Sequence, residues 1–184
     1  MPIPLGILAV AGASAPAEPF ALISSTVLGS NATTISFSGI PQTYNHLQLR
    51  CLFRNSAAQF QVEPWMQFNG SATGYAKHEL SGVQSTVAGS NPQSAQTRIN
   101  LPGANAANDT ANVFSFYVID ILDYKDTSKV KTVKSWTGAS GATSQGIWLH
   151  SGLWENTSAI SSILFDFDNG DFLANSKISL YGRG

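Results

Sequence analysis

Hydrophobic and polar residues alternate with a period of two along most of the chain after residue 19. Residues 46–54 show the pattern clearly, because every second position is apolar: Leu47, Leu49, Cys51 and Phe53. The intervening positions are polar except for Leu52. A period of two places successive side chains on opposite faces of a strand. This segment is therefore predicted to be a half-buried strand with one face in solvent.

Other segments show the same period with different faces. Residues 113–122 are apolar on both faces, which is typical of a strand in the centre of a sheet. Residues 147–154 alternate between two sets, and we expect both faces of this strand to be covered: Ile147, Leu149 and Leu153 on one face, and Trp148, His150 and Trp154 on the other. Further strands are expected at residues 20–28, 33–37, 62–68, 75–87, 96–101, 130–137, 163–167 and 178–180.

Short turn sequences separate these runs. Asn69-Gly70 and Asn169-Gly170 are strong hairpin signals, because Asn and Gly tolerate positive φ. The only candidate helix is a turn or two between Asp123 and Lys129. Many short strands with almost no helical period predict an all-β fold, an antiparallel β-sandwich of jelly-roll type.

The first nineteen residues differ from the rest. They are apolar, carry no charge before Glu18 and contain four prolines. We interpret residues 1–19 as an extended N-terminal docking arm and residues 20–184 as a single sandwich domain. The contact residues of the arm are expected to be its aliphatic side chains: Ile3, Leu5, Ile7, Leu8 and Val10.

Two other interpretations of the arm are weaker. A secretory signal peptide needs a basic n-region, and the chain has no Lys or Arg before Arg50. A transmembrane helix needs about twenty continuous apolar residues, and prolines interrupt this stretch.

Composition narrows the class of partner. The 184-residue chain has only 11% charged residues and a net charge of −1, against roughly 25% charged residues in an average soluble domain. No basic field is present to attract nucleic acid, and no membrane partner is expected. Low charge together with an apolar arm favours an assembled protein. Cys51, the only cysteine, excludes an internal disulfide and fits a buried core thiol.

The residue pattern contains little that predicts chemistry. Residues 166–171 partly resemble a calcium loop, but their spacing fails the EF-hand pattern and an acidic turn is the better interpretation. The three histidines lie on separate predicted strands without metal-ligand spacing: His46, His78 and His150. Asp120 and Asp123 form a possible carboxylate pair. No motif supplies a nucleophile, a base and an orienting group together. We therefore expect no catalytic, metal or cofactor site.

Aromatic residues offer the remaining candidates for binding. Most are expected in the core. Trp148, His150 and Trp154 form the exception, as candidate aromatics for receptor binding or for a subunit interface.

A series of short motifs occurs in an order that resembles small virion structural proteins of tailed bacteriophages: Ile3-Pro-Leu-Gly-Ile-Leu8, Phe20-Ala-Leu-Ile-Ser-Ser25, Ile40-Pro-Gln-Thr-Tyr-Asn-His-Leu-Gln-Leu-Arg50, Phe68-Asn-Gly70, Ile119-Asp-Ile-Leu-Asp-Tyr124, Ser151-Gly-Leu-Trp-Glu-Asn-Thr-Ser-Ala-Ile160 and Ser176-Lys-Ile-Ser-Leu-Tyr-Gly182. The resemblance implies a homotrimeric β-sandwich without catalytic residues. Members serve as cement (decoration) proteins on the outer capsid surface, where their partner is the major capsid protein. Related sandwiches at the ends of tail fibres and tailspikes imply an alternative, a module that binds a host surface glycan. A short chain with one arm fits the cement role better.

Overall fold

The protein is built from β-strands, and the computed structural model describes residues 20–89, 93–142 and 145–184. No helix occurs within these residues. The strands in chain order are β1 (Ala21–Val27), β2 (Thr34–Phe37), β3 (His46–Phe53), β4 (Gln61–Val62), β5 (Pro64–Phe68), β6 (Tyr75–Val83), β7 (Thr86–Gly89), β8 (Gln93–Gln96), β9 (Ile99–Asn100), β10 (Ala104–Asn105), β11 (Ser115–Leu122), β12 (Lys131–Ser140), β13 (Gln145–Trp154), β14 (Ile163–Phe167) and β15 (Lys177–Arg183). The predicted arm, residues 1–19, lies outside the described residues.

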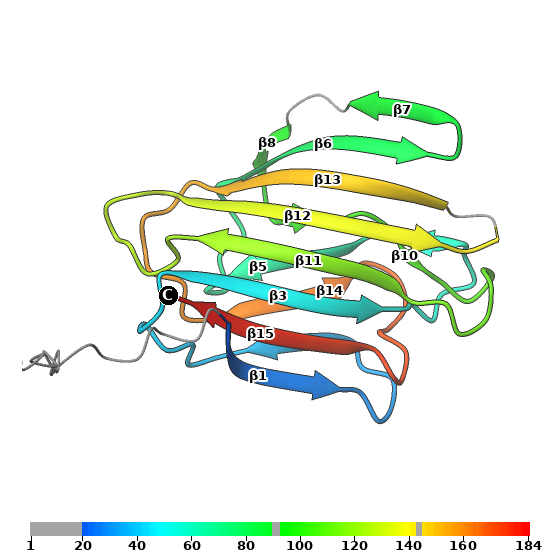
Figure 1. The fold of residues 1–184 in the computed structure, drawn as a ribbon, viewed down its shortest axis with the longest axis horizontal. Helices are drawn as coiled ribbons and strands as arrows, with labels where there is room; N and C mark the ends of the chain where they lie inside the picture. Colours follow the sequence, from blue (N-terminus) through cyan, green and yellow to red (C-terminus); the bar gives the residue numbers. More distant parts are fainter. Residues whose placement is uncertain (1–19, 90–92, 143–144) are drawn as a thin grey trace, which may run out of the picture.

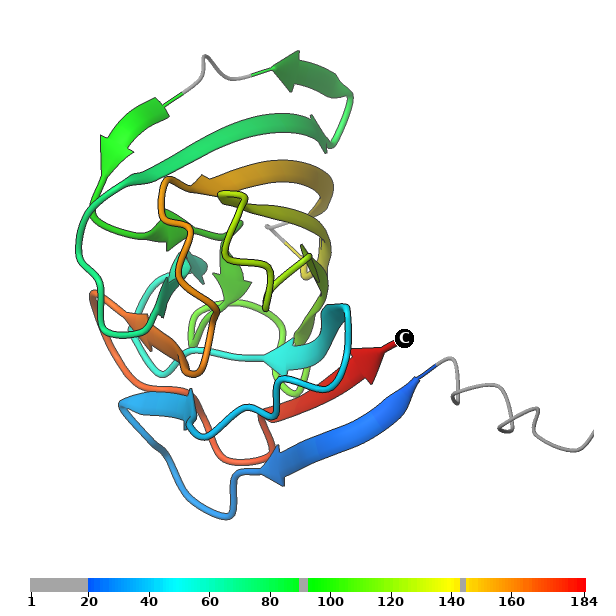
Figure 2. The same cartoon turned by 90° about the vertical axis from the view of Figure 1, so that its left-hand side faces the viewer.

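A large antiparallel sheet forms one layer. Its strand order is β1-β15-β3-β11-β12-β13-β6-β7, and β8 also pairs with β6. Figure 1 shows these strands side by side, and the turned view in Figure 2 shows that the sheet curves around the smaller strands. Strand β11 pairs with β3 on one side and β12 on the other, which confirms its prediction as a central strand.

The second layer is smaller. It contains a four-stranded sheet in the order β2-β14-β5-β9 and the two-stranded pair β10-β4. The paired strands in both layers are antiparallel. The expected all-β antiparallel sandwich is therefore confirmed, whereas the jelly-roll connectivity stays a prediction.

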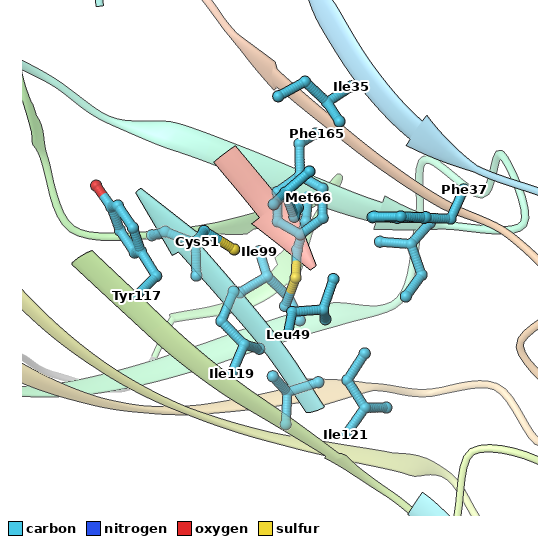
Figure 3. Close-up of a cluster of buried hydrophobic side chains, with 14 of the residues drawn as sticks. Ile35, Phe37, Leu49, Cys51, Met66, Ile99, Tyr117, Ile119, Ile121 and Phe165 are labelled. Carbon is cyan, nitrogen blue, oxygen red and sulfur yellow. The ribbon is translucent and has the colours of Figure 1, made fainter. Parts of the chain in front are cut away.

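The core lies between the two layers. Leu47, Leu49, Cys51 and Phe53 of β3 are all buried, as the alternation predicted. Figure 3 shows side chains of β3 and β11 meeting Met66 and Phe165 of the smaller sheet. Burial raises the pKa of the Cys51 thiol well above its usual value, so this thiol stays protonated and unreactive.

One turn and one strand differ from their prediction. The Asn69-Gly70 turn has positive φ at both residues, as expected, but it connects β5 to β6 in different sheets instead of closing a hairpin. The predicted strand at residues 75–87 is itself a hairpin of β6 and β7, in which Val83 pairs with Thr86. Gln84 adopts a positive φ of 52° between them.

The prediction of a short helix between Asp123 and Lys129 is wrong, because this segment consists of turns and bends. Asp123 has a positive φ of 48°, which a right-handed helix does not allow. The fully buried Lys131 fixes the backbone of this segment by hydrogen bonds to carbonyl oxygens. Its ammonium group donates hydrogen bonds to the carbonyl oxygens of Asp126, Lys129 and Thr157.

Candidate interaction surface

The outer face of the large sheet, which points away from the smaller sheet, carries a group of apolar side chains. We call this group the apolar patch, and it comprises the half-buried Val118 and five exposed residues: Leu80, Phe116, Trp136, Ile147 and Leu149. Trp136 is 50% exposed and Ile147 is 58% exposed. Isolated apolar residues on a surface are ordinary, but a contiguous group marks an interaction site.

Strand register makes the patch contiguous. Trp136 of β12 lies opposite Val118 of β11 on one side and Leu149 of β13 on the other. Leu149 in turn lies opposite Leu80 of β6. One row of four apolar side chains therefore crosses β11, β12, β13 and β6. Directly opposite residues in antiparallel strands are about 5 Å apart, so their side chains are in contact range.

A second row contains a glycine that shapes the patch. Gly138 lies opposite both Phe116 and Ile147. The Phe116 ring occupies the space that a side chain at position 138 would take. In this position Phe116 packs edge-on against Trp136, with ring centroids 5.6 Å apart and planes at 89°. This geometry is favourable for aromatic pairs and fixes both rings on the surface.

Shallow hollows flank the central row of the patch. One, of about 470 Å³, is lined by Phe116, Gly138 and Ile147 among others. Another, of about 320 Å³, is lined by Leu80, Leu149 and their neighbours on β11 and β12. The face therefore offers apolar walls beside a raised aromatic pair, and it suits inserted aliphatic side chains.

The outer face of the smaller sheet is different, because polar side chains predominate there. Arg98 lies over the Trp65 ring, with its guanidinium carbon 5.1 Å from the ring centroid. The same guanidinium group makes two hydrogen bonds to the Asp168 carboxylate, and this contact lowers the pKa of Asp168. The ion pair is at the surface, since the Asp168 side chain is 63% exposed.

The structure corrects the prediction that Trp148, His150 and Trp154 are surface aromatics. All three belong to the inner face of β13 and are buried, with exposed fractions of 8%, 2% and 1%. Trp154 stacks on Tyr75 with ring centroids 6.2 Å apart, inside the core. The opposite face of β13, with Ile147 and Leu149, is the one in solvent.

His150 forms a buried polar pair instead of a binding site. Its Nε2 lies 2.7 Å from Oε2 of Glu79 on the neighbouring strand β6. Burial lowers the pKa of His150 below its usual value, although the Glu79 carboxylate acts in the opposite direction. A neutral His150 therefore donates its Nε2–H to Glu79 and links β13 to β6.

Of the other candidate groups in the described residues, His46 and Asp123 are neighbours, and the rest are not brought together. His46 lies near Asp123, whereas His78 projects from the outer face of β6. Asp120 accepts a hydrogen bond from Gln48, so it is engaged on the sheet, and Asp123 pairs with Lys129 in the loop.

In the acidic loop at residues 166–171, two carboxylates are hydrogen-bonded to other groups of the protein. Besides the Arg98 pair of Asp168, the carboxylate of Asp166 accepts a hydrogen bond from the backbone N–H of Phe167. Within the described ranges, no group of three or more His, Cys, Asp or Glu side chains is placed to hold a metal ion. The described part of the chain also has no helix with the length and apolarity that crossing a membrane requires.

Comparison with family models, with curated proteins and with solved structures finds no match to this chain.

The sequence pattern did not place Phe116, Val118 and Trp136 on the outer face of the sheet, where Phe116 and Trp136 are exposed and Val118 is half-buried. A signal for two of them was present, because residues 113–122 are apolar on both faces. That pattern predicts a central strand, but it does not say which of the two apolar faces is covered. In the described structure only one face of β11 is buried, so the second apolar face is available for a partner.

Proposed function

We propose that the protein is a structural component of a tailed-bacteriophage particle, a cement protein that binds the outer capsid surface as a homotrimer. The observation that carries the proposal is the apolar patch on a rigid sheet face, in a chain that has few charges. Its partners are further copies of the chain and the major capsid protein, and its location is the virion.

The physical demands of a cement protein match these features. A cement protein has to bind a preformed lattice of identical subunits, and many weak apolar contacts repeated by symmetry give it high avidity. Burial of apolar surface stabilises such contacts by about 25 cal/mol per Å². A chain with a net charge of −1 adds little long-range repulsion between neighbouring copies.

The arrangement of the ionisable groups supports a structural role over an enzymatic one. His150 is buried inside the sandwich, and its Nε2 is engaged by the half-buried Glu79. The carboxylates of Asp120 and Asp123 each have partners of their own. His150 borders the hollow of about 320 Å³, which His78 and Ser151 also line. His150 projects from the inner face of β13 and Ser151 from the outer face, so the two side chains do not converge as a base and a nucleophile.

The alternative, a tail module that binds a host glycan, loses the residues on which it depended. Trp148 and Trp154 are inside the fold and cannot stack on a sugar. Trp136 remains as an exposed aromatic, but its neighbours Val118 and Leu149 are aliphatic and offer no hydrogen bonds to a glycan.

Antibody labelling of phage particles tests the proposal. We expect label over the faces of the head in electron micrographs. Label confined to the tail tip would contradict the cement role.

A binding assay tests the surface itself. Purified capsids stripped of the protein are mixed with the full chain and sedimented. We expect Ile147→Asp to reduce co-sedimentation by at least about tenfold, since it places a charge within the apolar patch. Val27→Asp is the matched control, because Val27 is equally exposed, at 59%, but lies on the edge strand β1. Equal loss in both variants would contradict a specific role for the patch.

A further inference from the structure

The apolar patch has no cover among the described residues, and the chain itself contains a segment suited to cover it. We propose that residues 3–10 of the N-terminal arm dock on the apolar patch of the large sheet. This inference rests on the proposed function, in which copies of the chain assemble on the capsid, and on the docking arm expected from the sequence. It names the surface that receives the arm, and the arm seated on the patch then forms part of the surface that meets the capsid.

The start of the described chain points to this face. Phe20 packs edge-on against Tyr181, with ring centroids 6.4 Å apart. The guanidinium carbon of Arg50 lies 5.0 Å from the centroid of the Phe20 ring and 5.1 Å from that of Tyr181. Both Arg50 and Tyr181 project from the outer face of the sheet. Their side chains are at least partly exposed, whereas the residues before and after each of them in the strand are buried. The chain therefore enters strand β1 from the outer side of the large sheet.

Strand register connects this entry point to the patch. Arg50 of β3 lies opposite Val118, the first residue of the central apolar row. Val118 lies opposite Trp136, and the row continues across β13 to β6. A segment that continues from Phe20 along this row leaves the charged group of Arg50 and passes onto apolar side chains.

The length of the arm is sufficient. Ten residue steps separate Val10 from Phe20, and an extended chain covers at most about 3.3–3.6 Å per residue, or roughly 35 Å. Strands in a sheet are about 4.8 Å apart, so the three steps from β3 to β13 amount to roughly 14 Å. The aliphatic part of the arm is therefore long enough to reach the patch of its own chain.

The chemistry of the arm fits a sheet face better than a sheet edge. Ile3, Leu5 and Ile7 are aliphatic, and no charged residue precedes Glu18. Pro2 and Pro4 have no backbone N–H, so a segment that contains them is a poor partner for an edge strand. On the face of the sheet, affinity comes from side chains that enter the hollow of about 470 Å³ beside Phe116 and Ile147 and the hollow of about 320 Å³ beside Leu80 and Leu149.

Cysteine cross-linking in the full chain tests the inference. One variant combines Ile7→Cys with Leu149→Cys, and the matched control combines Ile7→Cys with Val27→Cys. Val27 lies on the outer side of the edge strand β1, opposite Lys177, within reach of the arm but off the patch. Cys51 is buried and its thiol has a raised pKa, so it does not compete.

After mild oxidation, we expect the Leu149 pair to form a disulfide at least about fivefold faster than the Val27 pair, because docking raises the local concentration of the two thiols. Equal rates for the two pairs would overturn the inference. A faster disulfide between two Leu149→Cys chains without the Ile7 substitution would also overturn it, since patch would then lie against patch.

Mixing two single variants separates this inference from the proposed function. A disulfide between a chain with Ile7→Cys and a chain with Leu149→Cys supports arm exchange between copies. A disulfide confined to one chain supports the docking surface but contradicts an arm that ties neighbouring subunits. Both cross-linking results are obtained without capsids. Failure of the arm to dock is therefore distinguished from failure of the protein to bind capsids, which the co-sedimentation assay measures.

Discussion

Arg54, directly after β3, is the residue whose replacement tests the physical account of the fold most directly. Its side chain is only 5% exposed. Nη1 donates hydrogen bonds to the carbonyl oxygens of Thr110 and Val113, at 2.7 and 2.8 Å, and Nη2 donates one to that of Asp109, at 3.0 Å. One guanidinium group therefore holds the segment between β10 and β11.

The cost of Arg54→Met follows from two opposing effects. A net stabilisation of about 1.5–3 kcal/mol is typical of a hydrogen bond to a charged group, and three such bonds are lost. Removal of the charge also relieves a desolvation penalty of several kcal/mol, and methionine keeps part of the packing of the stem. We expect the free energy of unfolding to fall by about 3 kcal/mol, which corresponds to a decrease in Tm of roughly 6–12 °C for a chain of this size.

Thermal and urea unfolding, followed by circular dichroism, measure this change. Arg50→Met, on β3 itself, is the matched control, because Arg50 is exposed and its ring contacts contribute only about 0.5–1 kcal/mol. Equal Tm values for the two variants would refute the reasoning, since the three carbonyl groups would then be satisfied without the guanidinium.

Three further predictions follow from other sites. Because burial lowers the pKa of His150 from its ordinary value of 6.5, the unfolded chain binds a proton before the folded chain does, and stability should fall as the pH drops below about 6.5. Urea midpoints at pH 7.5 and 5 should differ less in His150→Gln than in the wild type, and an unchanged difference would argue against this cause. Gly141→Ala should lower the free energy of unfolding by about 1–3 kcal/mol in a urea titration, because its Cβ would overlap the carboxylate of Asp109. Gly29→Ala is the control, since no atom lies within 4 Å of its Cβ, and a change of at most about 0.5 kcal/mol is expected there. Asp168→Ala should cost less than about 1 kcal/mol, as for surface ion pairs; a Tm that rises with calcium in the wild type but not in this variant would revive the calcium site.

Much of the sheet was predictable because alternation is a local property. The inward residues of β3 and the central position of β11 follow from the period of two and from apolarity on both faces. The register of strands more than twenty residues apart, such as β15 beside β3, depends on contacts between distant segments and is not encoded locally.

The turns show the same division. Asn69-Gly70 adopts the positive φ values that its residue types favour. Whether the flanking strands pair with each other was decided elsewhere, because β5 pairs with β14 and β9, and β6 pairs with β13. The side chain of Asn69 accepts hydrogen bonds from the backbone N–H groups of Ser161 and Ser162, so the turn is used to fasten a distant loop.

For the candidate surface, the sequence by itself determined that the Ile147 and Trp148 sets lie on opposite faces of one strand. It did not determine which face turns inward, because alternation separates the two faces of a strand without saying which one is buried. The tertiary structure decided this. Tyr75 and Phe68 surround Trp154 and provide a place for the large aromatic set, whereas Leu149 meets Trp136 and Leu80 on the open side. Packing against the second layer is a property of the whole fold, and it alone placed the apolar patch in solvent.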